Sequence, residues 1–147
     1  MKENYLIRIE GTMEQSGDVD TVELMTKGSF VQKNGNFFIS YKETEATGYE
    51  GNVTTVKVEK DNKVSMLRFG TSPSQLVIEP GRRHVCHYDS GYGVLSLGVA
   101  ADEIQNRLTD KGGDITFSYT LDSGDAHLSR NKVFIKVQEA DNIPCPK

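Results

Sequence analysis

The stretch that decides the fold is GGDITFSYTLDSGDAHLSRNKVFIKVQ, residues 112–138. It holds two segments, ITFSYTL at 115–121 and KVFIKVQ at 132–138, in which apolar and polar side chains alternate. The turn-forming sequence DSGD at 122–125 separates them. The apolar series are Ile115, Phe117, Tyr119 and Leu121, followed by Val133, Ile135 and Val137. A side-chain period of two gives a strand one dry face and one wet face, so this stretch predicts half-buried antiparallel strands.

The same pattern recurs along the whole chain. Turn signals rich in Asn, Asp and Gly, such as NGN at 34–36 and DKGG at 110–113, separate further β-rich segments. These segments are YLIRIEG, VELMTKGSF, FFISYK, NVTTVKVE, KVSMLRF, SQLVIE, RHVCHYD and GVLSLGV. A meander of about ten strands must close, or nearly close, to avoid two exposed edges. We therefore predict an all-β, antiparallel up-and-down barrel of about eight to ten strands over residues 1–140, followed by an irregular tail at 141–147.

Composition excludes several functional classes. The 147 residues carry 17 basic and 21 acidic side chains, giving a net charge of −4 with no basic block, which disfavours nucleic-acid binding. No stretch approaches the roughly 20 apolar residues of a membrane span, and the start MKENYLIRIEGTMEQ lacks the apolar core of a secretory signal. We expect a cytoplasmic protein. Without a signal, the two cysteines, Cys86 and Cys145, are expected to be free thiols.

The segment VAADEIQNRLTD, residues 99–110, fits the strand pattern poorly. Its residues are good helix formers, and Ile104 and Leu108 lie at helical spacing, so propensity alone favours a short helix. As a strand, Ile104, Asn106 and Leu108 would share one face, which is also acceptable.

Several motifs resemble those of the YwiB-like family of Gram-positive bacteria. They are TGYEGNVTT at 47–55, R-x-G at 68–70 and the E-x-G-x-R…Y…Y-G block at 79–93. The resemblance implies a calycin-like barrel of the lipocalin and fatty-acid-binding-protein type, in which residues 94–109 form one long, bent strand. The family has no established activity, so the resemblance implies an architecture and no functional residues.

The stretch EPGRRHVCHYDSGYG, residues 79–93, is the most reactive in composition. On a strand, His84, Cys86 and Tyr88 share one face, and two potential metal ligands lie next to each other there. A third ligand is missing from the pattern, and no motif lowers the pKa of the thiol or orients a base. We therefore expect no metal site, no cofactor and no catalytic residue, and interpret the stretch as a barrel strand with its turns.

Arg68 is the most informative charged residue, because it shares a strand face with Val64 and Met66. A buried guanidinium needs a partner. That partner is a carboxylate of this chain (Glu43, Glu45 or Glu50) or an anionic ligand, for which Tyr41 and Tyr88 could supply hydroxyl groups. Alternatively, the face with Leu67 and Phe69 is the inner one and Arg68 extends into water.

The candidate ligand-binding residues are therefore Arg68, Tyr41, Tyr88 and Arg82. They lead to the hypothesis of a non-enzymatic module that binds a small, partly apolar, anionic molecule inside the barrel. The alternative is a filled barrel that acts as a protein-interaction or assembly partner, with a dimer among the options. The loop at 44–52 could form a lid over the barrel mouth or a wide connection at its end.

Overall fold

The computed structural model describes residues 5–45, 50–71, 73–89 and 93–140, apart from the side chains of Tyr88 and Asp89. The predicted tail at 141–147 and the middle of the 44–52 loop lie outside these residues. The described part of the chain is all β. Its strands are β1 (Tyr5–Gln15), β2 (Asp18–Lys33), β3 (Asn36–Lys42), β4 (Asn52–Val58), β5 (Val64–Gly70), β6 (Ser74–Ile78), β7 (Arg83–Asp89), β8 (Val94–Thr109), β9 (Gly112–Asp122) and β10 (His127–Glu139).

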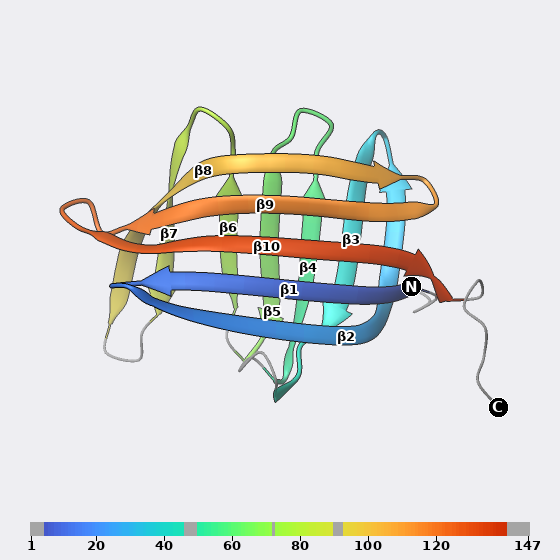
Figure 1. Cartoon of the computed structure of the whole chain (residues 1–147), viewed down its shortest axis with the longest axis horizontal. Helices are drawn as coiled ribbons and strands as arrows, with labels where there is room; N and C mark the ends of the chain where they lie inside the picture. The colour runs from blue at the N-terminus through green and yellow to red at the C-terminus, as the bar shows by residue number, and fades with distance from the viewer. Residues whose placement is uncertain (1–4, 46–49, 72, 90–92, 141–147) are drawn as a thin grey trace.

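The ten strands form one antiparallel sheet in the order β6-β5-β4-β3-β2-β1-β10-β9-β8-β7. Strands that follow each other in sequence are neighbours, and β1 pairs with β10, which joins the two ends of the chain. The sheet curls on itself so that β6 and β7, at the two ends of the order, lie beside each other (Figure 1). The predicted up-and-down barrel is confirmed, and it is nearly closed.

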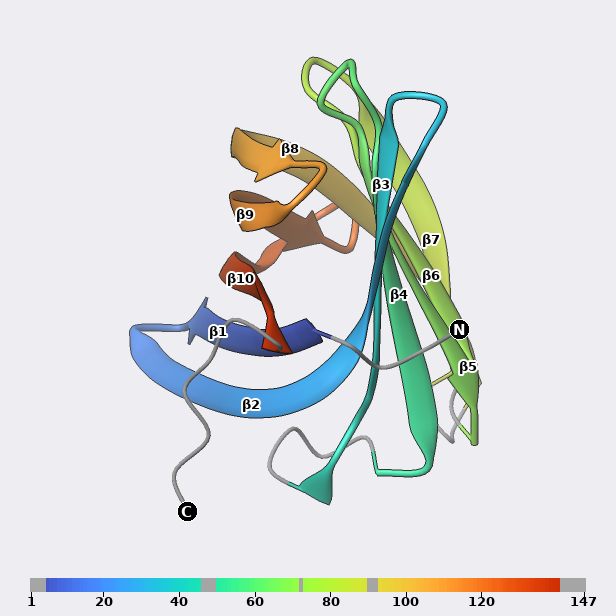
Figure 2. The same ribbon diagram turned by 90° about the vertical axis from the view of Figure 1, so that its right-hand side faces the viewer.

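The barrel is flattened into two layers whose strands run crosswise (Figures 1 and 2). β1, β8, β9 and β10 lie in one layer and β3 to β7 in the other, while the long strand β2 bends from the first layer into the second. Its residues up to Gly28 pair with β1, and those from Gly28 onward pair with β3. Gly28 is therefore the corner of the barrel.

Close approach of the backbone explains why this corner is a glycine. A Cβ atom at Gly28 would lie 2.3 Å from the carbonyl oxygen of Ser40 and 2.4 Å from Cδ1 of Ile7. No side chain fits at such distances unless the backbone of β3 moves. Glycine is used in strands at sharp bends of this kind.

All of the ambiguous segment at 99–110 except its last residue belongs to β8, which ends at Thr109, so the helix favoured by propensity is not formed. β8 pairs with β9 along most of its length and with β7 at its start. A bulge between Ala101 and Glu103 interrupts its pairing with β9, and Thr120 donates a hydrogen bond to Asp102 Oδ2 at 2.9 Å there. Tertiary pairing overrides the helical propensity of this segment, as is common for strands in closed sheets.

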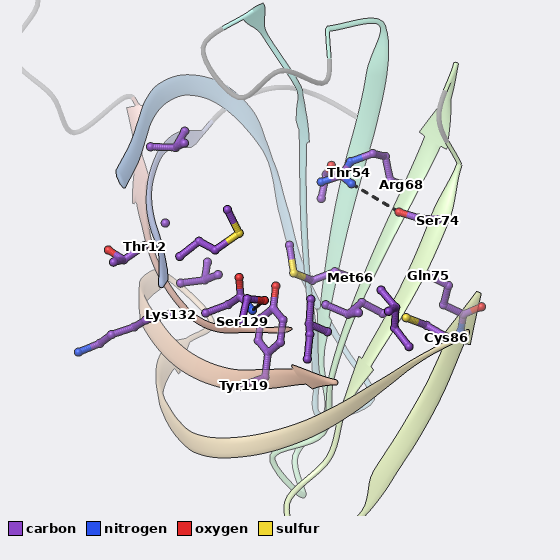
Figure 3. A pocket seen from close by; sticks show the side chains of 18 of the residues that line it. Thr12, Thr54, Met66, Arg68, Ser74, Gln75, Cys86, Tyr119, Ser129 and Lys132 are labelled. Carbon is purple, nitrogen blue, oxygen red and sulfur yellow. Dashed lines mark hydrogen bonds between the residues drawn. The ribbon is translucent and has the colours of Figure 1, made fainter. Parts of the chain in front are cut away.

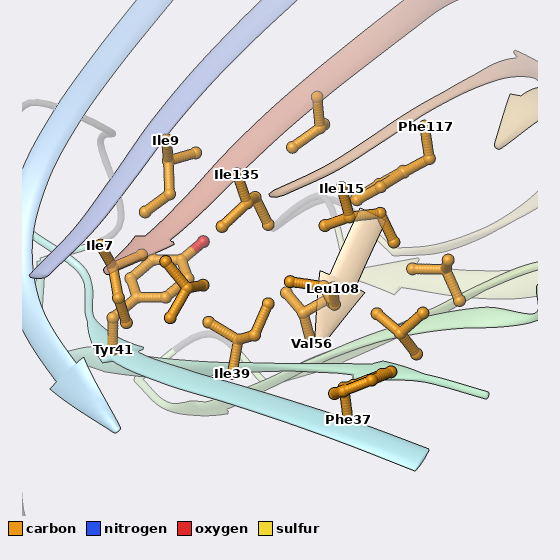
Figure 4. Packing of buried hydrophobic residues seen from close by; sticks show 14 of the residues in the cluster. Ile7, Ile9, Phe37, Ile39, Tyr41, Val56, Leu108, Ile115, Phe117 and Ile135 are labelled. Carbon is orange, nitrogen blue, oxygen red and sulfur yellow. The ribbon is translucent and has the colours of Figure 1, made fainter. Parts of the chain in front are cut away.

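The inner faces of the strands divide the barrel into a packed half and a hollow half. Figure 4 shows the packed half, where Val, Ile, Leu and Phe side chains from both layers interdigitate. Along six strands the inner residue changes from packed to cavity-lining: Ile7 to Gly11, Ile39 to Tyr41, Val56 to Thr54, Val64 to Arg68, Ile115 to Tyr119 and Ile135 to Asn131. Each fully buried aliphatic side chain contributes about 1.5–3 kcal/mol, so the packed half can stabilise the fold and leave the other half free for a site.

Candidate functional site

The hollow half contains a cavity of about 640 Å³ that is partly open to solvent. Figure 3 shows that polar side chains enter it from both layers. Thr54, Arg68 and Ser74 come from β4, β5 and β6, and Tyr119 and Ser129 come from β9 and β10. Apolar side chains, among them those of Met66, Leu76, Leu97 and Leu121, line the space between these groups. This combination of apolar walls and a few converging polar groups is typical of small-molecule sites.

Arg68 forms an internal ion pair on the inner wall. Its Nη2 lies 3.5 Å from Glu43 Oε2, and the two side chains are 18% and 3% exposed. Thr54 donates a hydrogen bond to the same carboxylate oxygen at 2.5 Å, and Arg68 Nη1 lies 3.5 Å from Ser74 Oγ. Of the three alternatives for Arg68, the structure thus shows the inward orientation and the partner Glu43.

The contact between Glu43 and Arg68 is long for a hydrogen-bonded ion pair. Glu43 Oε2 and Arg68 Nη2 are 3.5 Å apart, whereas well-aligned N–H···O hydrogen bonds measure about 2.7–3.2 Å. Arginine can instead offer two parallel donors to a planar anion. Arg68 thus brings a charged, hydrogen-bonding group to the cavity wall, and Glu43 offsets its charge.

Tyr41 completes the polar cluster from β3. It is 4% exposed and lines the cavity. Burial raises the pKa of Tyr41 well above its ordinary value of 10.0, and the neighbouring Glu43 carboxylate raises it further. The phenol thus stays protonated and remains a hydrogen-bond donor inside the barrel.

The raised pKa of Tyr41 predicts a stability change at high pH. The unfolded chain releases this proton near pH 10 and the folded chain does not. The free energy of unfolding contributed by Tyr41 should therefore be fully present below pH 10 and fall as the pH rises beyond it. Urea unfolding at several pH values should show a shallower decline for Tyr41→Phe than for the natural protein. Equal slopes would contradict the burial of a neutral phenol.

The sequence-predicted site residues do not all meet. Arg68 and Tyr41 line the same cavity. Tyr88 lies on β7 opposite Leu95, and its side chain is outside the described residues. Arg82 is exposed in the turn between β6 and β7 and does not line the cavity.

Several polar residues of the cavity were not predicted. Thr54, Ser129 and Asn131 are buried, and Asn131 Nδ2 donates to Ser129 Oγ at 3.0 Å. Each occupies the same alternating series as the core residues of its strand, such as Val56 or Val133. A polar residue inside an otherwise apolar alternating series is the signal that could have found them.

His84 and His87 contact polar side chains of neighbouring residues, and Cys86 lies between them on β7. His84 Nε2 lies 2.9 Å from Glu79 Oε1, while His87 Nδ1 lies 3.3 Å from Ser96 Oγ. Cys86 is a free thiol whose pKa burial raises, the opposite of what an activated nucleophile needs. Within the described ranges, no three His, Cys, Asp or Glu side chains gather to hold a metal ion.

Fold and cavity together define a single-chain antiparallel β-barrel protein. The chain belongs to the family described as domain of unknown function (DUF1934), whose model matches residues 7–135. It is 24% identical over 119 residues to the uncharacterized beta-barrel protein YwiB of Bacillus subtilis (strain 168). The aligned residues make up 81% of this chain and 82% of that protein. The resemblance seen in the sequence motifs is thereby confirmed.

A solved structure shows the same fold. The crystal structure of the ywiB protein from Bacillus subtilis superposes with a TM-score of 0.73 at 22% identity, covering 90% of this chain and 89% of that chain. At this level of identity the likeness concerns the fold alone. In the part of the chain that the structure describes, no helix is long and apolar enough to cross a membrane.

Proposed function

We propose that this protein is a non-enzymatic module that binds a small, partly apolar molecule with a polar or anionic end inside the barrel. The observation that carries the proposal is the cavity of about 640 Å³, which lies within the range of about 300–1,000 Å³ for ligand sites. Its apolar lining would hold the body of the ligand. Arg68, Tyr41 and Ser74 would bind its hydrogen-bond acceptors.

The charge balance of the site favours an end group that accepts hydrogen bonds. Arg68 offers donors, and the protonated Tyr41 offers another. Glu43 offsets the charge of Arg68, so the site does not demand a full negative charge. Displacement of a fluorescent probe by a carboxylic acid, its amide and its alcohol of equal chain length would rank these end groups.

A cavity-filling variant tests the proposal. Met66→Trp should weaken the binding of anilinonaphthalene sulfonate, an apolar anionic dye, by at least about tenfold, because indole would occupy the space of the ligand. The measurement is a fluorescence titration. Met25→Trp is the matched control, since Met25 is 60% exposed on β2 and lies outside the cavity lining. Equal weakening in both variants, or saturable binding in neither the natural protein nor the control, would refute the proposal.

One observation favours the second candidate, a protein-interaction role. Val53 and Phe69 are 39% and 57% exposed and lie directly opposite each other on the outer face of β4 and β5. An apolar pair of this kind can take part in an association surface. A molar mass that rises with protein concentration in light scattering, and that Phe69→Lys returns to the monomer value, would favour this role.

A further inference from the structure

In the part of the chain that the structure describes, the barrel wall has one place where neighbouring strands are not paired along their length. β6 pairs with β5 and β7 pairs with β8. Between β6 and β7, the described residues form a single bridge, Glu79 with Arg82, next to the turn. We call this place the seam. Every other strand has a hydrogen-bonded neighbour on both sides.

The register at the turn explains why the seam does not close. Leu76, Ile78 and Cys86 pack on the core, so the inner positions are even-numbered on both strands. The bridge joins an odd position, Glu79, to an even one, Arg82, across a turn of only two residues. If this register continued, inner residues of β6 would lie opposite outer residues of β7. Antiparallel partners must share a face, so the two strands cannot pair further.

A second cavity of about 320 Å³ lies at the seam. Gln75 and Val77 line it from β6, and His84, Val85, Cys86 and His87 line it from β7. Three of these residues, Gln75, Cys86 and His87, also line the interior cavity. The seam therefore adjoins the hollow half of the barrel and not the packed half.

Because few backbone hydrogen bonds cross the seam, we expect widening it to cost less than separating a paired ladder. Among the described residues, the polar contacts across the seam include the bridge, in which Arg82 N donates to Glu79 O at 3.2 Å, and the contact of His84 Nε2 with Glu79 Oε1 at 2.9 Å. Opening the wall between β5 and β6 would instead break a ladder of backbone hydrogen bonds that extends over residues 64–68 of β5. Backbone hydrogen bonds broken without replacement are costly.

We propose that the seam is the route by which a small molecule enters and leaves the barrel, with Glu79 as the contact that restrains it. This inference rests on the proposed function, because it names the path to the same cavity. A route affects the barrier to binding and not the bound state. Changes at the seam should therefore alter the association and dissociation rates together and leave the dissociation constant unchanged.

The first test closes the seam by one inserted residue. A glycine between Gly81 and Arg82 would shift β7 by one position, so that inner residues of the two strands face each other. In stopped-flow measurements with anilinonaphthalene sulfonate, both rate constants should fall by about tenfold, with the dissociation constant within about twofold. Slower hydrogen exchange of the β6 and β7 amides would show, without any ligand, that the strands have paired.

The second test loosens the seam and does not depend on the insertion folding. Glu79→Gln removes the charge that faces His84, and both rate constants should rise several-fold at an unchanged dissociation constant. Glu10→Gln is the matched control, in an exposed ion pair with Arg8 on β1, and should leave the rates unchanged. Saturable binding whose rates respond to neither seam variant would overturn the seam route alone. Absence of saturable binding would overturn the proposed function and the route together.

Discussion

Replacing Gly28 with alanine is expected to lower the free energy of unfolding by about 3 kcal/mol. The added methyl group would meet the Ser40 carbonyl oxygen at 2.3 Å, and this oxygen belongs to the backbone of β3. Relief of the contact requires a shift of the strand pair at the point where β2 passes from one layer to the other. Urea unfolding followed by circular dichroism would measure the loss.

Gly11→Ala is the matched control for this corner. Gly11 lies on β1 with no atom within 4 Å of its Cβ position. Because glycine inside a strand is less favourable than alanine by about 0.5–1 kcal/mol, Gly11→Ala should leave the stability unchanged or raise it. Equal free energies of unfolding for the two variants would contradict the requirement for glycine at position 28.

The second large effect is expected at the internal ion pair. Arg68→Met should lower the free energy of unfolding by about 3 kcal/mol, because it leaves Glu43 buried without its counter-charge. Glu43 is 3% exposed, so water cannot replace the guanidinium without a local rearrangement. Urea unfolding at neutral pH would measure the loss.

Two further variants separate this mechanism from a simple loss of packing. The double variant Arg68→Met with Glu43→Gln removes both charges and should recover most of the stability. Arg8→Met is the surface control: Arg8 is 44% exposed and pairs with Glu10 at 2.6 Å and Glu23 at 3.1 Å, and exposed pairs contribute at most about 1 kcal/mol. A double variant as unstable as Arg68→Met alone would contradict the account of the pair.

The barrel could be predicted from the sequence because side-chain alternation and turn residues are local features of the chain. Alternation in 115–121 and 132–138, with Gly and Asn turns between strands, predicts antiparallel neighbours without knowledge of distant contacts. Local pattern could not distinguish a helix from a strand for residues 99–110. Its helix-forming residues become a strand because β9 offers a partner along most of their length.

The cavity could be predicted only in part. Val64, Met66 and Arg68 compete with Leu67 and Phe69 for the inner face, and both series are apolar enough to qualify. The structure places Arg68 inward, and Phe69 is 57% exposed outside. Glu43 was one of three candidate partners, because nothing local distinguishes it from Glu45 or Glu50. The corner at Gly28 and the unpaired seam depend on strand register, which requires the assembled sheet.

The most direct test of the ligand-binding account is a crystal structure of the protein grown with anilinonaphthalene sulfonate. Electron density for the dye is expected inside the hollow half, with its sulfonate near Arg68 and its rings against Met66 and Leu121. An empty cavity, with the dye confined to the exposed outer face near Val53 and Phe69, would contradict it.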